Sequence, residues 1–99
     1  MGYLAMHYVY ILQCADGTYY VGSTSNVEAR VTEHNEGVLG ACHTLHRRPV
    51  TLVYTEPFAT VIDARRREDQ LKGWSHDKKS ALIAGDVETL KALSKRRRA

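Results

Sequence analysis

The sequence predicts a small α+β domain with the element order ββαβααα, in which a three-stranded antiparallel sheet is flanked by helices. A tyrosine-rich stretch, YVYILQCADGTYYVGSTSN from Tyr8 onward, contains two runs of β-forming residues around a turn. A second β-rich segment, VTLVYTEPF, follows at residues 50–58. The ninety-nine residues predict one domain over 1–99, with a core over about 7–84 and a helix and basic tail over 86–99.

The first two strands form a predicted hairpin over about residues 7–23, and its turn allows two registers. A two-residue turn at Asp16 and Gly17 would place Tyr10 and Tyr20 on opposite faces. A three-residue turn with Gly17 in the left-handed region would pair Tyr10 with Gly22 and bring both tyrosines to one face. The sequence permits both registers. In the second, Gly22 would leave open space beside Tyr10 for the close approach of a ligand.

Capping signals set the expected helix boundaries. Ser25 is the predicted N-cap of the first helix, with Glu28 completing a capping box, and the helix runs to about Asn35 before Gly37 ends it. The remaining boundaries are a strand between Pro49 and Pro57, a helix from near Thr60, a helix from Ser75 to Gly85 and a helix after Asp86. The loop VLGACHTLHRRP before the strand is a candidate substrate-contacting segment.

Two helices carry charged residues where apolar ones are expected. In the first, Arg30 and His34 share a stripe with Val27 and Val31. On the simpler interpretation, Arg30 lies at the edge of the stripe and His34 is a satisfied boundary residue.

In the second helix, Glu68 lies among Val61, Ala64 and Leu71 on one apolar face. Because a buried carboxylate is costly unless paired, Glu68 either pairs with an arginine or faces a cleft and holds a cation. Arg65, one turn earlier, offers an ordinary helix ion pair as the alternative.

The net charge is +3, and many of the lysines and arginines lie in four basic clusters. This clustering favours a nucleic-acid partner over the simpler explanation that the charges only keep the protein soluble. The clusters are Arg47-Arg48, Arg65-Arg66-Arg67, Lys78-Lys79 and Lys95 to Arg98. A zinc site from Cys14, Cys42, His43 and His46 is disfavoured by its ligand spacing. With no transmembrane-length apolar run and no signal-peptide pattern, we expect a cytoplasmic protein with reduced cysteines.

These residues together resemble the GIY-YIG nucleases, most closely the small stand-alone members. Tyr8-Val9-Tyr10 and Tyr20-Val21-Gly22 are similar to the paired motif of that family. Arg30 follows Tyr20 by ten residues, His34 comes one turn later, and Glu68 lies in the next helix. The resemblance covers roughly residues 7–84. Departures are Tyr8 in place of the usual glycine, Ser23 where some repair members have lysine, and the lack of an asparagine after Asn35.

The resemblance implies cleavage of DNA phosphodiester bonds with one divalent ion, Mg²⁺ or Mn²⁺. In that assignment Glu68 holds the metal, Tyr20 acts as general base with Tyr10 as its hydrogen-bonding partner, and Arg30 stabilises the transition state. His34 would relay a proton or orient a tyrosine. The residues expected to contact nucleic acid are Gly22, Ser23, Arg47, Arg48, Arg65 and Lys72. Branched or nicked DNA, as in repair or recombination, is the candidate substrate.

Two other functions stay open at this point. One is a nucleic-acid-binding module without cleavage, and the other is a nuclease core that needs a protein partner to present its substrate. Convergence of Tyr10, Tyr20, Arg30 and Glu68 in one cleft would favour the enzyme.

Overall fold

The hairpin at the start of the chain adopts the register that brings its two key tyrosines to one face. The computed structural model of the chain describes residues 6–38 and 43–96. Strands β1 (His7–Gln13) and β2 (Tyr19–Thr24) pair antiparallel, with Tyr10 opposite Gly22. Gly17 has φ 86°, so the predicted three-residue turn is confirmed. Successive residues of a strand face opposite sides, so Tyr10 and Tyr20 share one side of the sheet.

Strand β3 (Thr51–Phe58) pairs antiparallel with β1 and completes the sheet in the order β2-β1-β3. The expectation that Pro57 would stop this strand is wrong, because the strand runs through Pro57 to Phe58. β3 lies at the edge of the sheet, where a residue without a backbone N–H is tolerated.

The first helix is α1 (Val27–Glu36), and its N-cap lies one residue later than predicted. The expected capping box of Ser25 and Glu28 is wrong, because the N-cap is Asn26, whose Oδ1 accepts a hydrogen bond from the backbone of Ala29. The backbone N–H of Asn26 donates in turn to the hydroxyl of Thr24, the last residue of β2. The strand end therefore determines where the helix begins. The helix ends at left-handed Gly37, as predicted.

The other three helices begin at their predicted caps. They are α2 (Val61–Lys72), α3 (His76–Ala84) and α4 (Val87–Arg96), and α3 also ends at Gly85 as predicted. Thr60 and Ser75 accept backbone hydrogen bonds at the starts of α2 and α3, and Asp86 does the same before α4. The order ββαβααα is confirmed. No helix in the described parts of the chain is long and apolar enough to cross a membrane.

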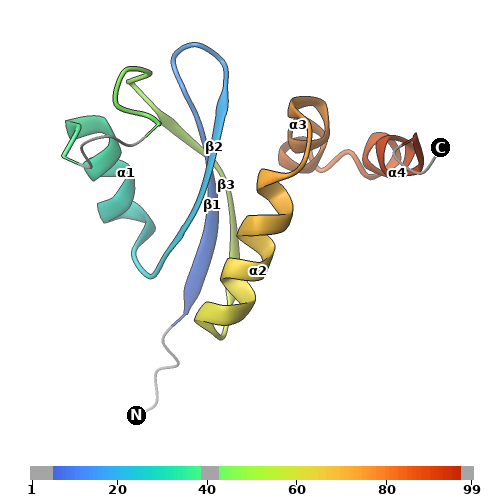
Figure 1. Cartoon of the computed structure of the whole chain (residues 1–99), viewed down its shortest axis with the longest axis horizontal. Helices are drawn as coiled ribbons and strands as arrows, with labels where there is room; N and C mark the ends of the chain where they lie inside the picture. Colours follow the sequence, from blue (N-terminus) through green and yellow to red (C-terminus); the bar gives the residue numbers. More distant parts are fainter. Residues whose placement is uncertain (1–5, 39–42, 97–99) are drawn as a thin grey trace.

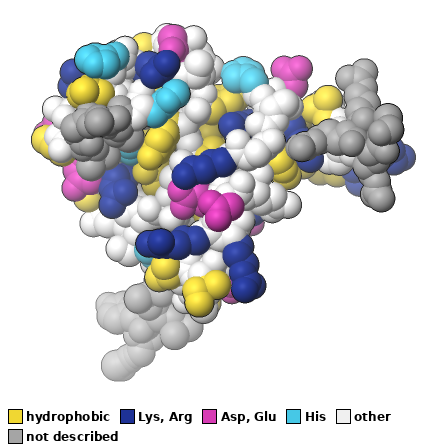
Figure 2. All heavy atoms as spheres, in the orientation of Figure 1, with side chains coloured by type: hydrophobic (Ala, Val, Ile, Leu, Met, Phe, Trp, Pro, Cys, Tyr) yellow, Lys and Arg dark blue, Asp and Glu magenta, His cyan; other side chains and the backbone are white. Residues whose placement is uncertain are grey.

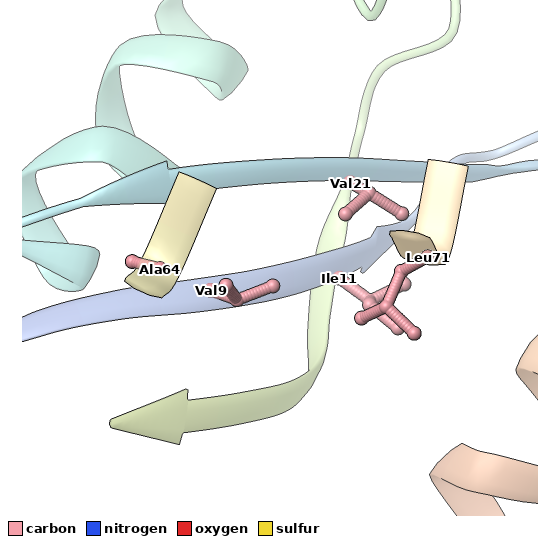
Figure 3. Packing of buried hydrophobic residues seen from close by; sticks show 5 residues of the cluster. All are labelled: Val9, Ile11, Val21, Ala64 and Leu71. Atoms are coloured by element: carbon pink, nitrogen blue, oxygen red, sulfur yellow. The ribbon is translucent and has the colours of Figure 1, made fainter. Parts of the chain in front are cut away.

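Helices α1 and α2 lie on opposite sides of the sheet, and α3 and α4 extend away beyond the end of α2 (Figure 1). The core on the α2 side consists of Val9, Ile11, Val21, Ala64 and Leu71. Leu71 points toward Ile11 and Val21 in Figure 3. Val61 is half exposed, so the apolar stripe of α2 is narrower than predicted.

The core on the α1 side is smaller and mixes structural with functional residues. Tyr10, Leu12, Cys14 and Val50 are buried there, and Val27 and Val31 of α1 pack against them. A candidate catalytic side chain is thus part of the packing that holds α1 to the sheet.

Candidate active site

A polar cleft of about 370 Å³ follows the free edge of β2, between α1 and α2. It is lined by Tyr10, Tyr20, Gly22, Ser23, Arg30, Arg65, Glu68 and Asp69. Because β2 is an edge strand, residues from both faces of the sheet reach this one cleft. In Figure 2 acidic side chains lie near the centre of this side of the molecule, with Lys and Arg side chains above and below them.

Tyr10 is buried, and its hydroxyl lies against β2. A Cβ built on Gly22 would stand 2.5 Å from the Tyr10 hydroxyl oxygen. The expectation that Gly22 leaves space for a ligand beside Tyr10 is therefore wrong, since the tyrosine side chain itself fills that space. Gly22 also lines the cleft, so its backbone still faces any bound substrate.

Tyr20 lies within an aromatic group at the cleft wall. Its ring centroid is 6.3 Å from that of Tyr10 and 5.0 Å from that of His34, edge to face with the histidine. His43 stacks beside the Tyr20 ring at 6.1 Å. His43 lies in the loop that the sequence predicts to contact substrate, but its pairing with Tyr20 was not predicted, because nothing in the local sequence indicates that this loop folds back onto that ring.

His34 is the buried centre of a hydrogen-bonded chain. Its Nε2 is 3.0 Å from the Tyr10 hydroxyl, and its Nδ1 is 2.7 Å from the Thr44 hydroxyl. Burial lowers the pKa of His34, and the charge of Arg30 lowers it further against an opposing effect of Glu33. His34 is therefore a neutral imidazole near pH 7 that holds Tyr10 in place. Thr44 was not predicted, since it lies in an irregular loop ten residues from His34.

Arg30 lies at the edge of the stripe of α1, half exposed. Its Nε donates to Glu33 at 3.0 Å, and the described residues engage no other donor of its guanidinium. The terminal amino groups can therefore meet an anionic ligand in the cleft.

Glu68 is held from two sides. The Ser23 hydroxyl donates to Oε1 at 2.7 Å, and Lys72 Nζ lies 2.7 Å from Oε2. Burial alone would raise the pKa of Glu68, but hydrogen bonds from Lys72 and Ser23 and the charges of Lys72 and Arg65 hold it below its ordinary value. The carboxylate both faces the cleft and has an ion pair, and that pair is with a lysine rather than with the arginine considered from the sequence.

The basic residues predicted to contact nucleic acid separate into two groups. Arg65 lines the cleft and Lys72 contacts Glu68 beside it. Arg47 instead pairs with Asp16 and donates to the His43 carbonyl, while Arg48 donates to backbone carbonyls. Neither of these two arginines lines the cleft.

A second hollow of about 510 Å³ lies between the end of α1 and the loop before β3. It is lined by Asn35, Leu45, His46, Arg48 and Pro49. It is larger than the cleft, but no carboxylate in the described part of the chain lines it, and His46 has no carboxylate or tyrosine beside it in this lining. The smaller cleft is therefore the better candidate for chemistry. Cys42 lies outside the described residues, and within them no group of three or more His, Cys, Asp or Glu could hold a metal ion.

The cleft suits a hard divalent cation better than zinc. Glu68 supplies an ionised carboxylate oxygen, and Asp69 lines the same cleft. Mg²⁺ takes oxygen ligands and usually keeps several waters, so one or two carboxylates with a substrate phosphate complete its shell. The residues present therefore fit such an ion.

The family model of the GIY-YIG catalytic domain matches residues 6–81 of this chain. A UPF0213 protein of Staphylococcus haemolyticus is 49% identical over 80 residues, covering 81% of this chain and 96% of its own. One of Halobacterium salinarum is 51% identical over 78 residues, covering 79% of this chain and all of its own. The chain therefore belongs to the GIY-YIG family, and within it to the UPF0213 proteins.

Solved structures agree with this assignment. The solution NMR structure of a UPF0213 protein from Bacillus halodurans is 42% identical, with a TM-score of 0.52, and the match covers 80% of this chain and 83% of that one. The solution NMR structure of a protein from E. faecalis is 38% identical, with a TM-score of 0.58 over 86% and 90% of the two chains.

The domain is thus of the nuclease type. GIY-YIG nucleases act on DNA and generally use divalent metal ions.

Proposed function

We propose that this protein is a metal-dependent endonuclease that hydrolyses phosphodiester bonds of DNA, with branched or nicked DNA of the kind met in repair or recombination as the candidate substrate. The observation that carries the proposal is the convergence of Tyr10, Tyr20, Arg30 and Glu68 on one cleft. These residues come from β1, β2, α1 and α2, so four separate elements each supply a polar side chain to the same cleft.

Tyr20 is the residue we assign to the attacking water. Its ring is fixed by contacts with Tyr10 and His34, so its hydroxyl has a defined position. In this role it takes the proton of the water or orients the water for attack on phosphorus. A free tyrosine is almost fully protonated at pH 7, so we expect activity to rise toward alkaline pH.

Tyr10 and His34 are assigned to holding the Tyr20 side chain in its position. The neutral imidazole holds the Tyr10 hydroxyl by a hydrogen bond, and the Tyr10 ring packs beside that of Tyr20. We assign Tyr10 to a hydrogen-bonding role in the cleft and His34 to orienting it.

Arg30 and Glu68 are the charged residues assigned to the reaction. The terminal amino groups of Arg30 stabilise the negative charge that develops on the phosphoryl oxygens during attack. Glu68 is the residue that would hold Mg²⁺ or Mn²⁺. When bound, such an ion supplies charge neutralisation at the scissile phosphate and the leaving oxygen.

The remaining assignments concern the substrate. Gly22, Ser23, Arg65 and Lys72 lie in or beside the cleft, where we assign them to the bound strand. Arg47 and Arg48 would contact DNA only outside the cleft. Such contacts to the backbone position the nucleic acid without reading its sequence. We place this activity in the cytoplasm.

The test is cleavage of labelled linear, nicked and branched DNA by the wild type and by Glu68→Gln, with Mg²⁺, Mn²⁺ or EDTA. We expect metal-dependent cleavage by the wild type that EDTA and Glu68→Gln abolish. Asp63→Asn removes a carboxylate charge from an exposed position of the same helix outside the cleft and serves as the matched control, with little effect expected. Equal cleavage by wild type and Glu68→Gln would contradict the assignment of the metal to Glu68.

Absence of cleavage by folded wild type would overturn the proposal of an enzyme active alone. Tight DNA binding would then indicate a binding module. Cleavage restored by cell extract would indicate a nuclease core that requires a protein partner.

A further inference from the structure

We infer that Lys72 occupies the place of the divalent cation on Glu68, so that binding the cation requires Lys72 to leave that oxygen. This inference rests on the proposed assignment of Glu68 as the metal-holding carboxylate. It adds a competition within the chain, by which the protein's own ammonium group sets the affinity of the site.

The two oxygens of Glu68 are engaged differently. Oε1 accepts a hydrogen bond from Ser23, which lies within β2 opposite Val9 and is held by the strand pairing. Oε2 lies 2.7 Å from the ammonium group of Lys72. Because a neutral hydroxyl on one oxygen is compatible with a cation on the other, Ser23 orients the carboxylate and leaves Oε2 as the oxygen for a cation.

An ammonium group and a divalent ion cannot share Oε2. Both positive charges would lie within a few ångströms of each other in a partly buried site, where their repulsion is only weakly screened. One must therefore leave when the other binds.

Lys72 is the group that can leave. Its side chain is 51% exposed, against 17% for Glu68, and it is the last residue of α2. The lysine ammonium is a flexible, strongly hydrated charge, and an ion pair this exposed contributes little to stability. Moving it into water therefore costs little, whereas Glu68 stays anchored by Ser23.

The lysine that leaves Oε2 remains beside the cleft that is proposed to take a phosphate. There it is available to contact the DNA backbone. By linkage, a phosphate that captures Lys72 strengthens cation binding, and the cation strengthens phosphate binding by the same factor.

The experiment is a titration of Mn²⁺ alone into the full chain, with free Mn²⁺ measured by electron paramagnetic resonance and no DNA present. Lys72→Gln is expected to bind Mn²⁺ about fivefold more tightly than the wild type, the size expected when an exposed ion pair no longer competes. Lys72→Arg keeps the charge and should remain near the wild type.

Lys91→Gln is the matched control, because it removes the same charge from an exposed position on α4. It should leave the Mn²⁺ affinity unchanged. Glu68→Gln should abolish the binding measured. Circular dichroism of each variant checks the fold, and Lys72→Met repeats the test if Lys72→Gln does not fold.

An affinity of Lys72→Gln equal to or weaker than that of the wild type would overturn the inference. An equal gain in Lys91→Gln would do the same, because it would show an effect of net charge. Mn²⁺ binding that survives in Glu68→Gln would place the ion elsewhere. The titration needs no cleavage, so a wild type that binds Mn²⁺ without cutting DNA would overturn the nuclease while leaving this competition intact.

Discussion

The hydroxyl of Tyr10 lies so close to Gly22 that a Cβ at position 22 would stand 2.5 Å from its oxygen. The two residues are directly opposite in the β1–β2 pairing. Tyr10 is buried and its hydroxyl is hydrogen-bonded to His34, so the ring cannot move away without breaking these contacts.

Gly22→Ala is therefore expected to displace Tyr10, destabilising the protein by about 1–3 kcal/mol and lowering DNA cleavage. Thermal unfolding and a cleavage assay measure both effects. Gly73→Ala is the matched control, because a Cβ there would meet the Gln70 carbonyl at an ordinary 3.5 Å. A Gly22→Ala protein as stable and active as Gly73→Ala would refute the close packing.

Removing the Tyr20 hydroxyl tests the role proposed for it. Tyr20→Phe keeps the ring contacts but is expected to lower the cleavage rate by about 10²-fold or more, the range for loss of a general base. Tyr8→Phe makes the same chemical change outside the cleft and should keep the wild-type rate. A Tyr20→Phe enzyme that retains full rate would exclude Tyr20 as the base.

Comparing two arginine variants tests whether DNA binds in the cleft. Arg65 lines the cleft, whereas Arg47 is held by Asp16 and a backbone carbonyl. We expect Arg65→Gln to weaken DNA binding and to reduce the salt slope of affinity by about one, and Arg47→Gln, outside the cleft, to have a smaller effect on both. Fluorescence anisotropy at several salt concentrations measures this. Equal losses in both variants would contradict the placement of DNA in the cleft.

His34 predicts the direction of a pH effect on stability. Its pKa is lowered from the ordinary 6.5 by burial and Arg30, so near pH 6 the unfolded chain binds more protons than the folded one. Stability should therefore fall as pH decreases below about 6.5, and this loss should be smaller in His34→Gln. Thermal unfolding between pH 7.5 and 5.5 measures both slopes. An NMR titration midpoint of His34 above 6.5 would contradict the prediction.

The last helix is expected to be dispensable for folding. Neither core cluster contains a residue of α4, and the family match ends at residue 81. A chain ending at Gly85 should keep its cooperative unfolding but bind DNA more weakly at low salt, because it loses basic residues such as Lys91 and Lys95. Circular dichroism and anisotropy measure the two properties. Loss of cooperative unfolding would show that α4 belongs to the folding unit.

Local signals in the sequence predicted most of the fold. Thr60, Ser75 and Asp86 each cap a helix, and Gly37 and Gly85 end helices, because these signals act through hydrogen bonds a few residues apart. The cap at Ser25 was predicted wrongly although the contacts that decide it are also local. The Thr24 hydroxyl at the end of β2 accepts the Asn26 N–H, and that contact moved the start of α1 to Val27.

The candidate site divides in the same way. Residue types and spacing, together with the resemblance to the GIY-YIG nucleases, were enough to predict Tyr10, Tyr20, Arg30, His34 and Glu68 as site residues. Only the tertiary structure decided that the Tyr10 side chain fills the space beside Gly22. It also decided that His43 and Thr44 reach the site. The same holds for the contacts of Glu68 with Lys72 and Ser23. A spacing along one helix limits which face a side chain shares. The groups it meets on that face come from distant segments, whose positions depend on how the sheet and helices pack.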